Sequence, residues 1–175
     1  MHAVPPLLEM PRLWLRPMQP DDVDSLLAIF TDPEVMSSFG VPPFDRAQMA
    51  QWVQRNLDHQ SRHGYGLFSV LLKTDGLLIG DCGLEWMDIE GVPAAELGYD
   101  VRRDYWNRGY ATEAAGAVRD YAFQHLQLPR LLSLIRAGNL ASQRVAEKIG
   151  MRNTGESTRH GQRYWHYELE REGSL

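Results

Sequence analysis

The stretch Glu96–Glu113 reads ELGYDVRRDYWNRGYATE. Its start alternates polar and apolar residues, which predicts a strand, and an arginine-rich loop then leads through Gly109 into a helix. The first backbone N–H groups of a helix have no intrahelical acceptor, so together with the helix dipole they form an anion site. Gly109 lets the backbone approach a phosphate closely, and Ala111 keeps the next turn small. This stretch therefore predicts a strand–loop–helix unit that can bind a phosphate group.

Two common phosphate-binding motifs do not describe this loop. No Gly-Lys-Ser/Thr follows, so it is not a Walker loop, and the Gly-x-Gly-x-x-Gly dinucleotide fingerprint is absent. An ordinary strand-to-helix turn that needs one glycine is the alternative interpretation of the same residues.

The elements around this loop predict an α/β fold. Strand 94–101, helix 109–126 and strand 131–136 form one β-α-β crossover, whose strands are parallel. Asn139 caps a helix that ends at Gly150. After this helix we expect a closing hairpin of 151–157 with 164–169. Before the crossover we expect, in chain order, a strand at 12–16, a helix from Pro20 to Phe30, a loop at 37–44, a helix at 45–63 and antiparallel strands at 65–72, 77–87 and 94–101. We find no repeat or linker, so residues 1–175 are expected to form a single domain.

The composition excludes several classes of protein. The chain has 175 residues, of which 43% are hydrophobic and 23% charged, so wholesale disorder is excluded. The single cysteine, Cys82, excludes an intramolecular disulfide and a cysteine-based zinc cluster. The net charge of −5 argues against a nucleic-acid partner. A membrane span is not predicted, because the sequence contains no run of about 18 apolar residues. We therefore expect a cytoplasmic protein that binds neither nucleic acid nor membrane.

Charge is distributed unevenly along the chain. Residues 1–101 carry 6 basic and 15 acidic side chains, residues 102–163 carry 11 and 5, and residues 164–175 carry 1 and 3, so the nets −9, +6 and −2 sum to −5. A polyanionic ligand would prefer the second region and a cationic ligand the first. Charges scattered over the folded surface without a ligand are the alternative.

Two segments carry a resemblance to a known family. The segment Tyr105–Ala114 resembles the coenzyme A pyrophosphate loop of the GNAT acetyltransferases, and Asn139–Met151 resembles the next motif of that superfamily. The spacing between them matches, and Arg12–Met18 followed by an acidic helix resembles the usual start. The resemblance covers nearly the whole chain and is closest to the RimJ/RimL-like branch of ribosomal-protein N-terminal acetyltransferases. It implies a single mixed, mostly antiparallel sheet with a parallel, splayed central strand pair and helices on both faces.

The resemblance also implies roles for residues that would contact acetyl-CoA. A bulge near the end of strand 94–101 would splay it from strand 131–136 and open a slot for the pantetheine arm. Asn139 would reach the pantetheine, and Ser142 would lie near the sulfur. The backbone would contribute along the arm at Tyr99, Val101 and Arg103, and around the pyrophosphate at Arg108, Gly109, Tyr110, Ala111 and Thr112.

Two positions depart from the family pattern. Trp106 stands where many members have Gln or Arg, which leaves cofactor binding in place because tryptophan is familiar in this branch. Ala146 stands where many members have a tyrosine that protonates the departing thiolate. Ser142, another side chain or water must then be the general acid, and a thiol with a pKa near ~8.5 needs little help to leave.

The acceptor amine requires a base. Strand alternation places Glu96, Gly98 and Asp100 on one face and Leu97, Tyr99 and Val101 on the other. We predict that Glu96 is the base, with Glu85 as the competitor, and that the N–H of Tyr99 polarises the thioester carbonyl. The acceptor cleft is predicted to be lined by Met36, Phe39, Glu85 and Trp86. No metal site is predicted, since His59 and His63 share a helix face without a third ligand.

We therefore expect an acetyl-CoA-dependent N-acetyltransferase acting on a primary amine, either a protein N-terminus or a small cationic molecule. A catalytically silent acyl-CoA-binding module, motivated by Ala146, is the main alternative. A succinyl donor is also open, because Arg102 or Arg103 can accept its carboxylate. A nucleotide-dependent phosphotransferase is a more distant reading, and a homodimer is implied by resemblance alone.

Overall fold

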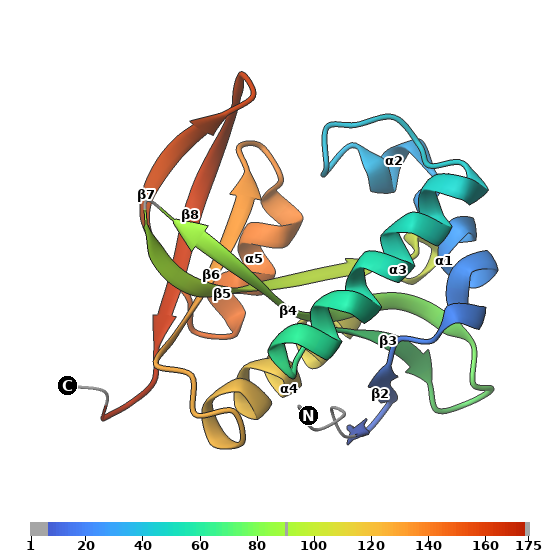
Figure 1. The fold of residues 1–175 in the computed structure, drawn as a ribbon, viewed down its shortest axis with the longest axis horizontal. Helices are drawn as coiled ribbons and strands as arrows, with labels where there is room; N and C mark the ends of the chain where they lie inside the picture. Colours follow the sequence, from blue (N-terminus) through green and yellow to red (C-terminus); the bar gives the residue numbers. More distant parts are fainter. Residues whose placement is uncertain (1–6, 90, 174–175) are drawn as a thin grey trace.

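The computed structural model describes residues 7–89 and 91–173, and within these ranges eight strands form one sheet in the order β1-β2-β3-β4-β5-β6-β8-β7 (Figure 1). Neighbouring strands are antiparallel except β5 and β6, which are parallel. The predicted α/β fold with a mixed, mostly antiparallel sheet is thereby confirmed. The strands are β1 Leu8–Glu9, β2 Leu13–Pro17, β3 Leu67–Leu72, β4 Leu78–Ile89, β5 Val92–Val101, β6 Arg130–Arg136, β7 Arg152–Arg159 and β8 Gln162–Glu170.

Helices cover both faces of this sheet, as predicted. One hydrophobic core joins the sheet to α4 and α5, and a second lies under α1, α2 and α3. In Figure 1 the three N-terminal helices gather at one end, and β7 and β8 stand at the other. The helices are η1 Pro20–Asp22, α1 Val23–Phe30, α2 Pro33–Met36, α3 Arg46–His63, η2 Arg103–Tyr105, α4 Tyr110–Gln124 and α5 Leu140–Lys148.

Local signals in the sequence explain where the helices begin and end. The Asp45 carboxylate accepts the backbone N–H of Gln48 at 2.8 Å, and the Gln48 side chain accepts the N–H of Asp45, which completes a capping box at α3. Asn139 Oδ1 accepts the N–H of Ser142 at the start of α5. Both caps were predicted from the residue type alone.

The short elements α2, β1 and η2 were not predicted. The break after α1 is also the start of α2, because Asp32 accepts the N–H of Glu34 at 2.9 Å and Pro33 occupies the first turn. Strand β1 is a two-residue strand that pairs with β2. The sequence between residues 31 and 36 therefore turns the chain and also places a helix over the sheet.

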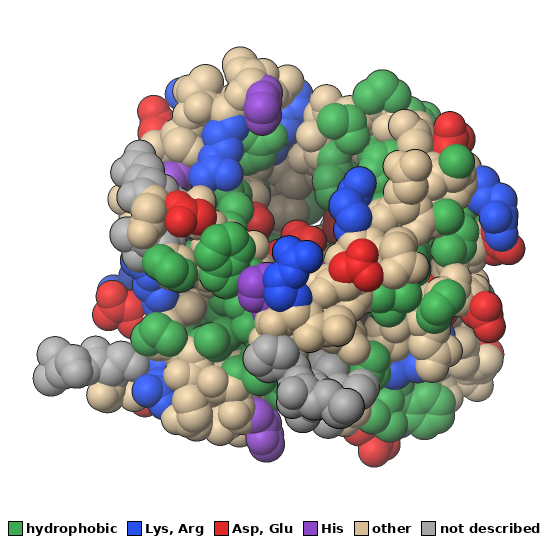
Figure 2. Space-filling view, viewed as in Figure 1, with side chains coloured by type: hydrophobic (Ala, Val, Ile, Leu, Met, Phe, Trp, Pro, Cys, Tyr) green, Lys and Arg blue, Asp and Glu red, His purple; other side chains and the backbone are tan. Residues whose placement is uncertain are grey.

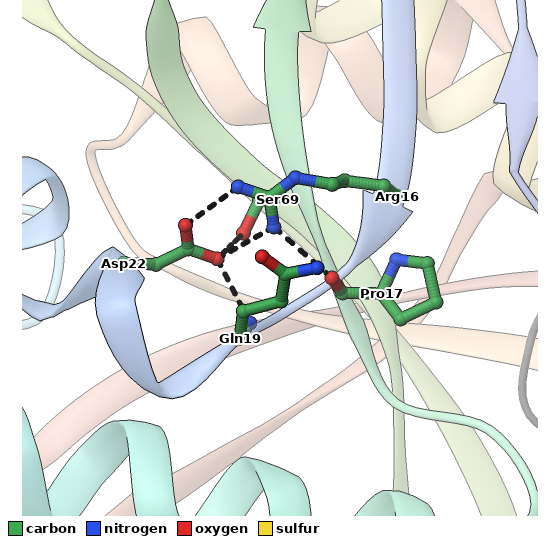
Figure 3. Close-up of polar contacts among 5 residues, drawn as sticks. All are labelled: Arg16, Pro17, Gln19, Asp22 and Ser69. Atoms are coloured by element: carbon green, nitrogen blue, oxygen red, sulfur yellow. Dashed lines mark hydrogen bonds and ion pairs between the residues drawn. The ribbon is translucent and has the colours of Figure 1, made fainter.

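A partly buried ion pair fastens the first helical segment to the sheet (Figure 3). Arg16 on β2 donates to both carboxylate oxygens of Asp22 at 2.8 and 2.6 Å. Ser69 on β3 and the backbone N–H of Gln19 donate to the same carboxylate. Burial alone would raise the pKa of Asp22, but these hydrogen bonds outweigh it and hold the pKa below its ordinary value.

The central strands β5 and β6 splay apart as predicted, but without the predicted bulge. Strands β5 and β6 pair only at Ala95 with Leu131 and at Glu96 with Leu132. The register of β5 with β4 is continuous along its whole length, so the bulge predicted near the end of this strand is not present.

Side chains take the place of the missing ladder between β5 and β6. The Ser133 hydroxyl donates to the carbonyl of Leu97 at 2.6 Å. The backbone N–H of Leu134 donates to Oε1 of Glu96 at 3.1 Å. These two contacts join β6 to β5 across the gap that opens beyond the last ladder pair.

Candidate active site

A cavity of about 290 Å³ lies beside the splay. Figure 2 shows the molecule hollowed on this face between its two halves, with acidic side chains at the border of the hollow. Phe39 and Trp52 line the cavity from the helical side, Glu96 and Tyr99 line it from β5, and Ser142 lines it from α5. A larger and more open groove of about 540 Å³ runs along the outer side of α4, but of the predicted site residues only Thr112 lines it.

Four carboxylates line the cavity from β4 and β5. The register places Asp81 opposite Asp100 and Glu85 opposite Glu96, so each pair lies on one face of the sheet. The predicted faces of β5 agree with the packing, because Leu97 and Val101 belong to the larger core with Tyr99 packed against it, whereas Glu96, Gly98 and Asp100 line the cavity. The role of Asp81 and Asp100 was missed, although the two strands carry the mirrored patterns Asp-x-Gly-x-Glu and Glu-x-Gly-x-Asp.

Glu96 lies at the point where β5 and β6 part. Burial raises the pKa of its carboxyl to about 7, and the charge of Glu85 acts in the same direction. The N–H of Leu134 and the charge of Arg159 oppose this shift. Glu85 is more exposed, and desolvation raises its pKa against the attraction of Arg55. A carboxyl that titrates near neutrality has the proton affinity that a general base requires.

Asp81 and Asp100 lie deeper in the cavity than Glu85. Asp81 is 1% exposed, and its Oδ2 has no hydrogen-bond partner among the described residues. Burial raises the pKa of Asp100 to about 7, with a contribution from the charge of Glu85. Burial also raises the pKa of Asp81, and the charges of Asp100 and Glu85 add to the effect.

Alternate residues of β5 direct their backbone N–H and C=O groups into the gap between β5 and β6. Arg102 N–H donates to the carbonyl of Ile79, and antiparallel pairs alternate, so Leu97, Tyr99 and Val101 turn their backbone groups toward β6. The carbonyl of Leu97 accepts from Ser133, and that of Val101 accepts from the Trp106 indole at 2.6 Å. In the described structure, β6 offers no ladder partner to the N–H groups of Tyr99 and Val101.

The start of α4 presents further N–H groups. The first intrahelical bond joins the N–H of Glu113 to the carbonyl of Gly109, so the N–H groups of Tyr110, Ala111 and Thr112 precede it. Gly109 has a φ of +79°, which glycine adopts without strain, and no side chain caps this helix. The guanidinium of Arg108 lies over the Tyr105 ring, 5.3 Å from its centroid. This arrangement is suited to binding a pyrophosphate.

Arg12 holds this loop from the other end of the sequence. Its guanidinium pairs with Glu113 at 2.6 Å and donates to the carbonyl of Arg108 at 2.9 Å. Its backbone N–H donates to the second oxygen of Glu113, and its guanidinium lies 4.3 Å from the centroid of the Tyr110 ring. This positioning role of Arg12 was not predicted, because its partners lie about a hundred residues away in the sequence.

The backbone of Arg103 was predicted to lie along the pantetheine arm. It lies in η2, beyond the end of β5, and its carbonyl accepts the N–H of Trp106 within the turn. Its guanidinium pairs with Asp32 at 3.0 Å. Arg103 therefore links the loop before α4 to the start of α2.

Helix α5 contributes Asn139 and Ser142, and both line the cavity. The Tyr99 hydroxyl donates to the carbonyl of Ser142 at 2.7 Å. Ala146, one turn further along α5, is fully buried. A tyrosine at that position would have to displace the packing around Ala146, which explains the small residue there.

The predicted acceptor-side residues divide into two groups. Phe39 and Glu85 line the cavity. Met36 is 1% exposed and belongs to the smaller core, so its predicted role is wrong. Trp86 does not line the cavity, because successive residues of a strand point to opposite faces and Glu85 points into the cavity. The Trp86 side chain is 43% exposed and stacks on His63 with an interplanar angle of 4°.

Across residues 7–89 and 91–173, no group of three or more His, Cys, Asp and Glu side chains is placed to hold a metal ion. In the same ranges, no helix has both the length and the apolar character needed to cross a membrane.

Comparison with known proteins gives the family that the two sequence motifs resemble. Residues 12–152 match the model of the acetyltransferase (GNAT) domain. A relative from Bacillus subtilis, named uncharacterized protein YkkB, is 39% identical over 141 residues, which are 80% of this chain and 81% of the relative. A second relative, from Bacillus licheniformis and named uncharacterized N-acetyltransferase p20, is 32% identical over 82% of this chain and 81% of its own length.

A solved structure supports the assignment. The acetyltransferase of Agrobacterium tumefaciens is 28% identical and superposes with a TM-score of 0.83 over 98% of both chains. The chain therefore belongs to the GNAT acetyltransferase family and is an acetyl-CoA-dependent acyltransferase.

Proposed function

We propose that this enzyme moves the acetyl group of acetyl-CoA to a primary amine by direct attack, with Glu96 as the base. The observation that carries the proposal is the Glu96 carboxylate at the splay, where burial raises its pKa to about 7. The acceptor is a protein N-terminus, as the RimJ/RimL-like resemblance implies, or a small cationic amine.

The residues around the splay fit coenzyme A. The N–H groups of Arg108, Gly109 and the first turn of α4 would hold the pyrophosphate, because this helix start has no side-chain cap. The N–H groups of Tyr99 and Val101 face the gap between β5 and β6, where the pantetheine arm would lie. Asn139 and Ser142 border the same cavity from α5.

When bound, acetyl-CoA supplies an acetyl group activated as a thioester. The chain must supply a proton acceptor. At pH 7 an alkylamine with a pKa of ~10.4 loses its proton at a cost of roughly 4–5 kcal/mol, and an α-amino group near ~8 at about 1.4 kcal/mol. Glu96 suits this role better than Glu85, since it is more buried and its orientation is fixed by the N–H of Leu134.

Two further groups complete the proposed chemistry. The N–H of Tyr99 is directed into the gap and would orient and polarise the acetyl carbonyl. The Ser142 side chain, on the α5 wall of the cavity, is the proposed proton donor in place of the missing tyrosine at Ala146.

The experiment measures binding first and transfer second. Calorimetry with coenzyme A, acetyl-CoA and Mg-ATP should show binding of both coenzyme A compounds and none of the nucleotide. An assay of thiol release with a panel of primary amines then tests transfer. Binding without transfer to any amine would identify a silent acyl-CoA-binding module, and no binding of coenzyme A would refute the proposed use of the loop.

A further inference from the structure

The cavity is a trough with two anionic ends. The pair Glu85–Glu96 lies four residues along the strands from the pair Asp81–Asp100, which is roughly 13 Å at about 3.3 Å per residue. Between the pairs, a side chain built at Gly98 would meet nothing within 4 Å. The floor of the trough is therefore open at Gly98, whereas Gly83, which pairs with Gly98, lies close against the backbone of Gly66 and Leu67.

The deeper end of the trough holds two carboxyl groups, and no Lys or Arg of the described residues forms an ion pair with either of them. Asp81 is buried, and its Oδ2 has no hydrogen-bond partner among the described residues. The register aligns Arg16, Ser69, Asp81 and Asp100 in one row across four strands. In that row, Arg16 and the Ser69 hydroxyl both bind Asp22 rather than Asp81.

An unpartnered buried carboxylate is costly, and native structures rarely keep one without a reason. None of the ion pairs found within the described ranges includes Asp81 or Asp100. The cation that lines the cavity, Arg136, instead donates to the carbonyl of Ser37 at 2.6 Å and to Gln162 at 2.7 Å. A ligand ammonium is the group that would satisfy Asp81.

The walls of the trough suit an alkyl chain. Phe39, Trp52, Leu67 and Leu97 contribute apolar surface to the lining. At about 290 Å³ the cavity is at the small end of the range for ligand sites. Apolar walls between two anionic ends match methylene groups between two ammonium groups.

We propose that the acceptor is a linear oligoamine, one nitrogen of which reacts beside Glu96 while a second, still protonated, binds Asp81 and Asp100. This inference rests on the proposed function. In the reaction the nitrogen forms a bond to the acetyl carbon and the carbon–sulfur bond breaks. Of the two protons that the reacting ammonium loses, one passes to Glu96 and then to solvent, and the other ends on the coenzyme A thiol.

The test compares spermidine with butylamine, which has a similar alkyl chain but a single nitrogen. We expect kcat/KM for spermidine to exceed that for butylamine by at least about tenfold. Asp81→Asn and Asp100→Asn each keep the side-chain shape and should reduce this ratio by a similar factor. Asp120→Asn removes the same charge from the exposed face of α4, where Asp120 pairs with Arg119, and should leave the ratio unchanged.

Binding provides a second readout that does not depend on turnover. Calorimetry on the coenzyme A complex should show spermidine binding more tightly than butylamine, and Asp100→Asn should remove the difference. Equal use or equal binding of the two amines overturns the inference, as does a ratio unchanged in both variants. A preference for peptides with uncharged side chains, independent of Asp81, also overturns it. Failure to bind coenzyme A would count against the proposed function instead.

Discussion

Replacing Glu96 by glutamine should remove most of the catalytic activity and stabilise the fold at alkaline pH. Glutamine keeps the length of the side chain, and its oxygen can still accept the N–H of Leu134, which bonds Oε1 of Glu96 at 3.1 Å. The substitution therefore removes the charge and little else. A residue that serves catalysis at a cost to stability should show both effects together.

The magnitude follows from the shift of the pKa of Glu96 from 4.5 to about 7. The folded state holds this proton more tightly than the unfolded state, so the contribution of Glu96 is complete below about pH 4.5 and is lost as the pH rises to about 7. A shift of this size corresponds to roughly 3 kcal/mol. For a protein of 175 residues, that raises the melting temperature of Glu96→Gln at pH 8 by roughly 6–12 °C.

Urea unfolding of the wild type and of Glu96→Gln between pH 4.5 and 8 measures this difference. The charged groups that act on Glu96 are Glu85 and Arg159, and Arg55 acts through Glu85, so all three stay unchanged. Glu156→Gln, exposed on β7, is the control and should shift stability by less than about 0.5 kcal/mol. A gain below about 1 kcal/mol at pH 8, or an equal gain at pH 4.5, would refute the burial argument. The pH profile of kcat/KM should rise with a midpoint near 7 in the wild type and lose this rise in the variant.

Three further substitutions test the framework around the site. Arg16→Ala leaves Asp22 buried without its cation and should lower the free energy of unfolding by about 3–5 kcal/mol in urea titrations; a loss below about 1 kcal/mol would contradict the role of the pair. Arg12→Ala removes the contacts to Glu113 and to the carbonyl of Arg108, and should weaken coenzyme A binding by roughly 1–2 kcal/mol in calorimetry, whereas an unchanged Kd would show that the loop is held by other contacts. Gly98→Val adds a side chain to open space, so the fold and coenzyme A binding should persist while amine turnover falls by at least about tenfold; full turnover would exclude this part of the trough from the acceptor site.

Local patterns predicted most of the fold because they act within a few residues. Asp45 and Asn139 cap their helices through hydrogen bonds to N–H groups only three residues ahead. The alternation along residues 94–101 gave the correct faces of β5. The contacts across the splay were not predictable in this way, because the contact between Ser133 and Leu97 joins residues 36 positions apart.

The candidate site was predicted only in part, because some of its residues come together only through contacts between distant parts of the sequence. Glu96 could be selected from its own strand, but the pairing of Asp81 with Asp100 depends on the register of β4, and a slip by one residue would turn a carboxylate away from the cavity. Met36, the last residue of α2, was misassigned because its side chain faces the core rather than the cleft, and this short helix was not predicted. Arg12 and Glu113, 101 residues apart, meet only in the folded sheet.

The polar row across β2, β3, β4 and β5 connects stability to function. At one end the charge of Asp22 is matched by Arg16, and this end fastens η1 to the sheet. At the other end Asp81 and Asp100 face each other without a cation, although the same row holds an arginine. Burial favours the protonated forms of Asp81 and Asp100, because no neighbouring cation among the described residues stabilises their charge. The cavity can admit a positive charge at this end, so a bound ammonium would favour the ionised carboxylates and would stabilise the folded state by linkage.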